Sequence, residues 1–316
     1  MRLFAYTQSP EIQTYLETCS SLRTTILTTP LPPTVELRMR FDGDIDRIYW
    51  AAMMENMAQT REHLTKLYLT DDGRKQSPQD TLLLSFRRLI ALVAHQWLAN
   101  PDPVSARDVG KIHLSVTHMD PSAPQAFPKS LTGELQKALP FLDQTSLDHP
   151  ILAGGLAYLT FRTDARFSPW TARAMSYLYL FRGGWDVRGM IVPDAMLRTQ
   201  FGQYTQALEE SLKRGNATPF LDLYTQAVRD NLAAIVTRMK EKTLANPLPP
   251  STGVLTPRER DILLYLSNPD ASITNTIVRK KYGVSQITAS RDLSRLLSLG
   301  FVVARGKGRS VRYSRM

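Results

Sequence analysis

Apolar residues recur along the first 245 residues at helical spacing rather than with the alternation of strands. Residues 80–98 have the length and apolar density of a buried helix, and residues 149–161 predict a core helix rich in small side chains. Residues 218–244 follow the pattern of a long amphipathic helix, and Ser105 stands where it can cap another helix. Because sustained alternation is scarce before residue 250, we predict an all-helical body.

Residues 245–256, ANPLPPSTGVLT, interrupt this helical pattern. Three prolines, together with Ser, Thr and Gly, disfavour a helix and are typical of an exposed linker. We therefore predict a helical domain over residues 1–245, a linker over residues 246–255 and a smaller domain over residues 256–316.

The C-terminal segment begins with a strong helix-start signal. Thr256 is a suitable cap, a proline follows it, and Glu259 completes the T-x-x-E capping box. A second short helix is predicted to end at Gly283, the residue type that closes helices in a left-handed conformation. Ser285 can cap a third helix, which is predicted to end at Gly300.

The third helix of this segment is amphipathic. Its apolar face is expected to consist of Ala289, Leu293, Leu296 and Leu297. After residue 300 the pattern predicts two short strands around the basic turn RGKGR. Three helices followed by a basic hairpin form the winged-helix arrangement. The predicted fold class is therefore mainly α, with an all-helical domain followed by a small α+β winged helix-turn-helix domain.

Charge indicates what this second domain binds. The chain has a formal net charge of +10, and residues 251–316 carry 12 Lys and Arg against 4 Asp and Glu, or +8. The first 250 residues therefore carry only +2. A nearly neutral body joined to a strongly basic end predicts an anionic partner for that end, and double-stranded DNA fits best. A winged helix that binds protein is the alternative.

The segment resembles the winged-helix domains of bacterial transcriptional regulators, in which S-x-x-T-x-x-R-x-L is a common recognition-helix pattern. That pattern stands here as Ser285, Thr288, Arg291 and Leu293. The expected DNA contacts, from the third helix, the helix before it and the hairpin, are Arg279, Lys280, Lys281, Ser285, Gln286, Thr288, Arg291, Arg295, Arg305, Lys307, Arg309 and Arg312.

Several other classes of protein are not expected. No run of about 18 apolar residues is present, which disfavours a membrane span, and the N-terminal residues lack the apolar core of a signal peptide. The single cysteine, Cys19, cannot form an internal disulfide, which favours a reducing cytoplasm. None of the five histidines has the H-x-x-x-H spacing of a metal site, so we expect no bound metal.

The stretch FRTDARFSPWTARAMSYLYLFRGGW, residues 161–185, has the outline of a phosphate site. Ser168 can cap a helix whose first position is a proline, and the free N–H groups of a helix start attract anions. Arg166 precedes this start and Arg173 lies one turn inside the helix.

The body resembles the Fic (filamentation induced by cAMP) family, whose members typically transfer AMP to a protein hydroxyl. Residues 147–161 and 171–185 resemble the helices that flank the family signature H-P-F-x-[DE]-G-N-[GK]-R-x-x-R. Glu55 and Asn56 match the inhibitory-helix motif [ST]-x-x-x-E-[GN], although Ala51 replaces its Ser or Thr. The downstream positions that match the family are Tyr204, Ala207, Leu208, Gly215, Pro219 and Phe220.

The catalytic positions of that signature are not kept. The general-base histidine corresponds to Arg162, which cannot accept a proton at neutral pH, and the acidic metal ligand corresponds to Arg166. A phosphate-binding glycine corresponds to Pro169, and the first arginine of the signature to Trp170. The last arginine is kept as Arg173, and the resemblance implies that it pairs with Glu55.

Two interpretations of this region remain. Glu55 and Arg173 form an ordinary buried ion pair, or Arg162, Arg166, Ser168 and Arg173 form a pocket for a small anion or a nucleotide such as ATP. No cofactor is expected.

We predict a homodimeric, DNA-binding transcriptional regulator that uses its degenerate Fic-like body for dimerisation or ligand sensing. The alternatives are a protein nucleotidyltransferase, an AMP-transferring Fic enzyme with a non-standard active site, and an adaptor protein.

Overall fold

The computed structural model describes residues 1–69, 77–117, 131–245, 255–266, 271–298, 301–306 and 311–315. The chain divides into two compact units, one of residues 1–28 and 43–236 and the other of residues 29–42 and 237–316. The division falls inside two helices. The predicted domain limits remain a prediction, and residues 246–254 of the predicted linker lie outside the described residues.

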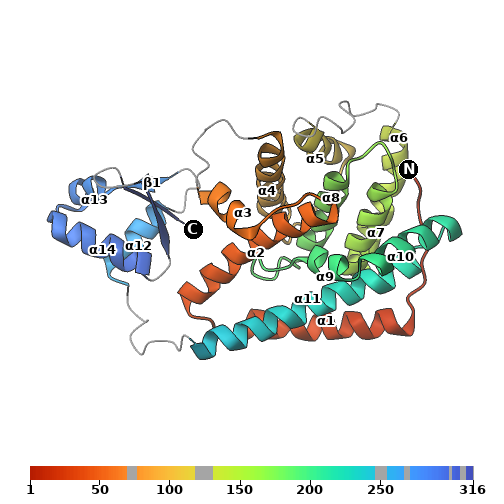
Figure 1. Cartoon of the computed structure of the whole chain (residues 1–316), viewed down its shortest axis with the longest axis horizontal. Helices are drawn as coiled ribbons and strands as arrows, with labels where there is room; N and C mark the ends of the chain where they lie inside the picture. Colours follow the sequence, from red (N-terminus) through yellow and green to blue (C-terminus); the bar gives the residue numbers. More distant parts are fainter. Residues whose placement is uncertain are drawn as a thin grey trace. The chain divides into compact units, whose positions relative to one another are not determined.

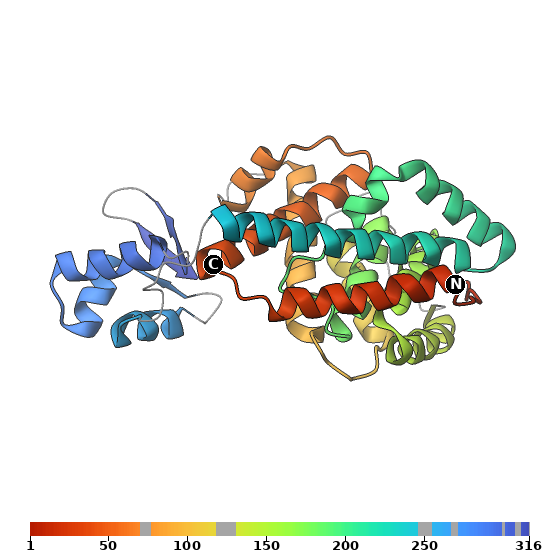
Figure 2. The ribbon, with the colours of Figure 1, turned by 90° about the horizontal axis from the view of Figure 1, so that it is seen from below.

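The described residues before 246 are mainly helical, as the hydrophobic pattern predicts (Figures 1 and 2). Before residue 271, the only strand-like pairing that the structure describes is an isolated bridge between Ala5 and Asn216. The helices are α1 Pro10–Thr28, α2 Pro33–Met54, α3 Arg61–Leu69, α4 Pro78–Trp97, α5 Ala106–Thr117, α6 Leu131–Asp148, α7 Pro150–Arg162, α8 Pro169–Arg182, α9 Pro193–Thr199, α10 Phe201–Arg214 and α11 Thr218–Ala245.

Helices α7 and α8 form the centre of the helical core, and almost all of their side chains are buried. Two glycines allow α7 to approach its neighbours. A Cβ on Gly154 would lie 3.2 Å from the Ser176 carbonyl oxygen in α8. A Cβ on Gly155 would lie 2.8 Å from Leu221 in α11. The small-residue pattern of residues 149–161 therefore serves close helix packing.

Helix α1 runs beside α11 in both views (Figures 1 and 2). Just before α1, the Ser9 hydroxyl donates a hydrogen bond of 2.8 Å to Asp222 of α11. No helix among the described residues combines the length and the apolar character that crossing a membrane requires.

The C-terminal elements follow the order α12 Pro257–Tyr265, β1 Ser272–Ile273, α13 Asn275–Tyr282, α14 Gln286–Ser298, β2 Val302–Arg305 and β3 Arg312–Arg315. The strands form an antiparallel sheet in the order β1-β3-β2. Val302 pairs with Arg315, and Ile273 pairs with Tyr313. A separate apolar core lies between these elements, and its buried side chains are Ile262, Leu266, Ile273, Val278, Ala289, Leu293, Leu296 and Val302.

The local signals of this segment are present in the structure. Thr256 and Glu259 form the capping box, and Gly283 has a φ of 62°. Two expectations need correction. Leu297 was expected on the buried face of α14 but is 41% exposed, because it lies at the flank of that face. Strand β1 was not expected, since two residues are too short to show an alternating pattern. Gly300, the expected end of the third helix, lies outside the described residues.

Candidate functional site

The first candidate site lies where α7 leads into α8. Arg162 is the last residue of α7, and Ser168 caps α8 by accepting a hydrogen bond of 3.2 Å from the Thr171 N–H. Pro169 occupies the first helical position, where its missing N–H is no loss. The Ser168 hydroxyl is therefore already occupied by an N–H group of α8, and Ser168 is buried.

Arg173 is buried between two acidic side chains. Its Nη2 lies 2.7 Å from Oε1 of Glu55, and its Nε donates a hydrogen bond of 2.9 Å to Oδ1 of Asp194. Arg173 is only 1% exposed. Nη1 has no hydrogen-bond partner among the described residues. The Glu55–Arg173 pairing that the family resemblance implies is therefore present as a contact.

Asp194 is a member of this cluster that the sequence analysis missed. Burial raises the pKa of the Asp194 carboxyl above its usual range, and the nearby positive charge of Arg173 partly offsets this. Asp194 lies in the first turn of α9, directly after Pro193. The only signal in the sequence was this Pro-Asp pair at a helix start, which does not say which cation the carboxylate will meet.

Arg162 lies half-buried near the same cluster. The charged and phenolic groups around it are Tyr204, Tyr158 and Glu55. The hydroxyls of Tyr158 and Tyr204 are hydrogen-bonded to each other at 2.7 Å. The Arg162 Nε has no hydrogen-bond partner among the described residues. The charge of Glu55 therefore attracts both arginines, and Glu55 contacts Arg173 directly.

Arg166 is neutralised by the chain itself. Its Nη1 and Nη2 donate to the two carboxylate oxygens of Glu134 at 2.9 and 2.8 Å. Its Nε and Nη2 donate to Asp164 at 2.8 and 2.6 Å. Hydrogen bonds from Arg166 and from the Met1 amino group lower the pKa of Glu134 to about 2, and Arg166 also lowers the pKa of Asp164, so both carboxylates stay charged. Glu134, from α6, is a second residue that the sequence analysis missed.

Aromatic side chains fill the space beside this loop. Phe167 and Trp170 are both buried. The Trp170 ring packs edge-on against Phe86 with 4.9 Å between the ring centroids, and Phe167 packs in the same way against Phe161 at 4.8 Å. The two rings therefore occupy interior volume next to the start of α8.

A small cavity lies beside Arg173 among the residues that the structure describes. It measures about 10 Å³ and is bordered by Tyr158, Ser176, Tyr177 and Asp194, among others. This volume has room for at most one water molecule. Of the four residues predicted to form an anion pocket, Arg173 contacts Glu55, and Arg162 is influenced by the Glu55 charge. Arg166 and Ser168 are hydrogen-bonded to other groups. Asn56 has a φ of 55°, and its Oδ1 accepts a hydrogen bond of 3.3 Å from Arg198.

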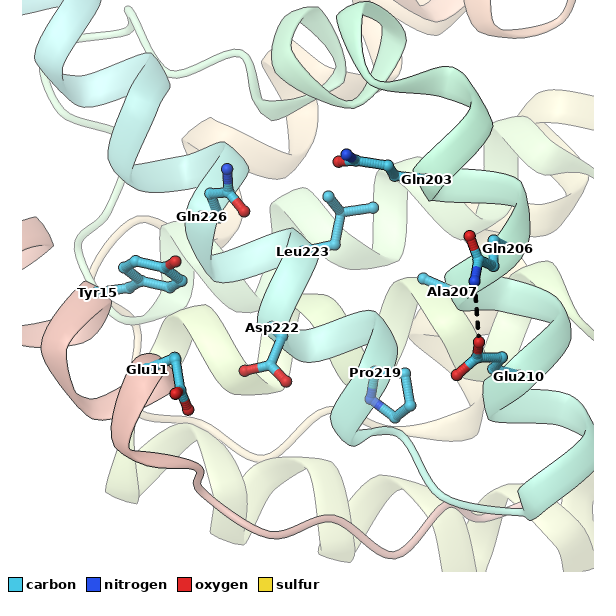
Figure 3. Close-up of a pocket in the computed structure, with 10 residues that line it drawn as sticks. All are labelled: Glu11, Tyr15, Gln203, Gln206, Ala207, Glu210, Pro219, Asp222, Leu223 and Gln226. Carbon is cyan, nitrogen blue, oxygen red and sulfur yellow. Dashed lines mark hydrogen bonds between the residues drawn. The ribbon is translucent and has the colours of Figure 1, made fainter.

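A larger groove lies on another face of the helical body, between α1, α10 and α11 (Figure 3). It measures about 300 Å³, and its lining includes the carboxylates of Glu11, Glu210 and Asp222. Burial and the nearby charge of Glu11 raise the pKa of Asp222, although its hydrogen bond from Ser9 opposes this. Carboxylates repel phosphate groups, so this groove is unsuited to a nucleotide. Among the described residues, no cluster of His, Cys, Asp and Glu is arranged to hold a metal ion.

The second candidate site is the exposed face of α13 and α14. Most of the predicted DNA-contacting side chains are exposed there or on the sheet, whereas Thr288 is half-buried. The exposed ones are Arg279, Lys280, Lys281, Ser285, Gln286, Arg291, Arg295, Arg305 and Arg312. Lys307 and Arg309 lie outside the described residues.

Some of these side chains also contact their own unit. Arg295 lies 3.5 Å from the buried Glu259, and the Lys281 ammonium lies 4.4 Å from the centre of the Tyr265 ring. The Ser285 and Thr288 hydroxyls are hydrogen-bonded to each other at 2.9 Å. Gln286 and Arg291 are therefore better placed to contact a ligand than Arg295 is.

Ile287 is a further residue of this face that the sequence analysis did not single out. It is 73% exposed, although it is a large apolar side chain. Its spacing from the buried residues of α14 was the signal that could have identified it.

Comparisons with known proteins give the class of fold. No protein-family model and no curated protein matches the chain. The solved structures that resemble it include a Fic family protein from Desulfovibrio desulfuricans, with a TM-score of 0.57 and 14% identity over 98% of this chain and 97% of that one.

Fic-1 from C. elegans is similar with a TM-score of 0.58 and 16% identity, over 73% of each chain. A Fic domain containing signaling protein from Bacteroides thetaiotaomicron has a TM-score of 0.51 and 14% identity, over 73% of this chain and 98% of that one. The chain therefore has a Fic-like fold. At these identities the similarity defines the fold alone.

Proposed function

We propose that this protein is a DNA-binding transcriptional regulator whose α12–β3 segment is a winged helix-turn-helix. The exposed basic and polar face of α13 and α14 carries the proposal. Helix α14 follows α13 after a left-handed Gly283, and its outward side chains can enter a major groove while Lys and Arg of α13 contact phosphates. A separate apolar core holds these elements in place.

The chemistry of the α7–α8 loop supports a non-catalytic role for the helical body. Phosphoryl-type transfer requires a positioned base and cations. Arg162 cannot act as a base, and Arg166 would repel a magnesium ion at the position where the family carries an acidic ligand. Phe167 and Trp170 occupy interior space beside the loop. The body then serves dimerisation or the sensing of a small anionic or nucleotide effector.

A homodimer fits this function because two winged helices reading paired half-sites bind more tightly than one. Light scattering of the purified chain, with and without DNA, measures the number of protein chains in each particle. A protein that remains monomeric on its binding site would exclude the paired half-site arrangement.

DNA binding is tested with the full chain and labelled duplex DNA at several salt concentrations. The logarithm of the binding constant should fall linearly with the logarithm of the salt concentration. Replacing Arg279 by Ala should reduce the magnitude of this slope by about 1 for a lost phosphate contact. Lys213→Ala, on exposed α10, is the matched control and should leave the slope unchanged. The absence of salt-dependent DNA binding would refute the proposal.

A second candidate function is AMP transfer by a non-standard active site. The 2.7 Å contact between Glu55 and Arg173 favours it, since the family resemblance assigns that pair an inhibitory role. Labelled ATP is incubated with cell lysate and either the unmodified protein or the Glu55→Ala variant. Label transfer that rises in the variant supports this function, and silence in both samples removes it.

A further inference from the structure

The most exposed large apolar side chain of α14 lies on the helix face that the proposed function assigns to DNA. Ile287 is the second residue of α14 and is 73% exposed. At 100° per residue, the buried Ala289, Leu293 and Leu296 lie about 180–240° around the helix from Ile287. Ile287 therefore points away from the core of its unit.

Polar side chains surround Ile287 on this face. Arg291 and Ser294 are four and seven residues further along and share its side of the helix, and both are exposed. Gln286 precedes it and is also exposed. A single exposed apolar residue is common on protein surfaces. What distinguishes Ile287 is its place near the N-terminal end of α14, the end that contacts base edges in helix-turn-helix proteins.

The major groove offers one apolar group that suits such a side chain. Thymine presents its 5-methyl group there, and each other base presents mainly hydrogen-bonding groups. An isoleucine cannot donate or accept a hydrogen bond, so it gains nothing from the polar base edges and gains burial from a methyl group. We infer that Ile287 contacts a thymine methyl group and makes the protein select a T·A pair at one position of its site. This inference rests on the proposed DNA-binding function.

Arg291 sets the expected neighbourhood of that thymine. Arginine most often reads guanine in the major groove through O6 and N7. Four helical residues advance about 6 Å along the helix axis, which is close to the ~7 Å of two base-pair steps. The binding site should therefore contain a guanine one or two base pairs from the selected thymine.

The experiment begins by selecting binding sites from a random duplex library with the full chain. Each thymine of the selected site is then replaced in turn by deoxyuridine, which removes only the methyl group. At one thymine, the unmodified protein should bind about fourfold more weakly, the effect of about one buried methyl group. Ile287→Ala should bind the thymine and uracil duplexes equally, and Ile287→Val should retain part of the preference.

Leu264→Ala is the matched control, because Leu264 is 72% exposed but lies on α12. It should leave the preference for thymine unchanged. If the unmodified protein binds the thymine and uracil duplexes equally at every position while salt-dependent DNA binding persists, only the inference about Ile287 is overturned. If the protein binds no DNA, the proposed function itself is overturned, and the inference with it.

Discussion

Replacing Arg173 by Met should strongly destabilise the helical body. The substitution removes the cation that lies between Asp194 and Glu55 and leaves the buried Asp194 carboxylate without a neutralising charge. Breaking a buried ion pair from one side costs about 3–5 kcal/mol. Because whole domains are stable by only about 5–15 kcal/mol, this loss is a large fraction of the total free energy of unfolding.

The loss should depend on pH in a defined direction. Burial already raises the pKa of Asp194 in the presence of Arg173, and removing the cation raises it further. An acid with a raised pKa in the folded state is accommodated best while it is protonated. Such an acid stabilises the folded state at pH values below its unfolded pKa, and this stabilisation is lost as the pH rises through its folded pKa. The stability difference from the unmodified protein should therefore be larger at pH 8 than at pH 5.

Urea unfolding followed by tryptophan fluorescence measures the free energy of unfolding at each pH. The signal reports on the helical body because all four tryptophans lie within the first 185 residues. Adding Asp194→Asn to Arg173→Met removes the stranded charge and should recover part of the lost stability. Arg214→Met is the control, since Arg214 is an exposed arginine paired with Glu210 at 3.3 Å and should change stability by less than about 1 kcal/mol. A double variant no more stable than Arg173→Met would refute the reasoning.

Three further substitutions test the helix packing, the α12 cap and the half-buried His149. Gly155→Ala should destabilise the body by about 1–3 kcal/mol in urea unfolding, because the new Cβ would lie 2.8 Å from a leucine of α11. Gly133→Ala is the control and should not destabilise the body, because its Cβ would meet nothing within 4 Å. Thr256→Ala should lower the stability of α12 by about 1 kcal/mol and speed hydrogen exchange of its amides. Unchanged exchange would contradict the capping role. Burial lowers the pKa of His149 to about 4, so stability should fall as the pH drops from about 6.5 toward 4, and His149→Asn should flatten that decline.

Local chemistry explains which parts of the structure could be predicted. The caps at Ser168 and Thr256 and the left-handed Gly283 each depend on backbone groups within a few residues. Such signals are complete within a short window of sequence. The long helices were predictable for a similar reason, since their apolar stripes repeat over many turns.

The parts that could not be predicted depend on how distant segments meet. Arg166 pairs with Glu134, 32 residues away, and Arg173 pairs with Asp194, 21 residues away. In the sequence, Arg166 and Arg173 are two cations near a helix start, which is the pattern of an anion site. Whether such cations stay available for a ligand depends on carboxylates that only the fold brings to them.

The cluster of Asp164, Arg166 and Glu134 also determines which substitutions the α7–α8 loop can accept. An acidic residue at position 166 would place a third negative charge beside two carboxylates that Arg166 and the Met1 amino group now neutralise. Replacing Arg166 by Asp or Glu would therefore place like charges side by side at this position of the loop. A single acidic substitution at position 166 thus removes the arginine that holds Asp164 and Glu134 together while it adds a further carboxylate.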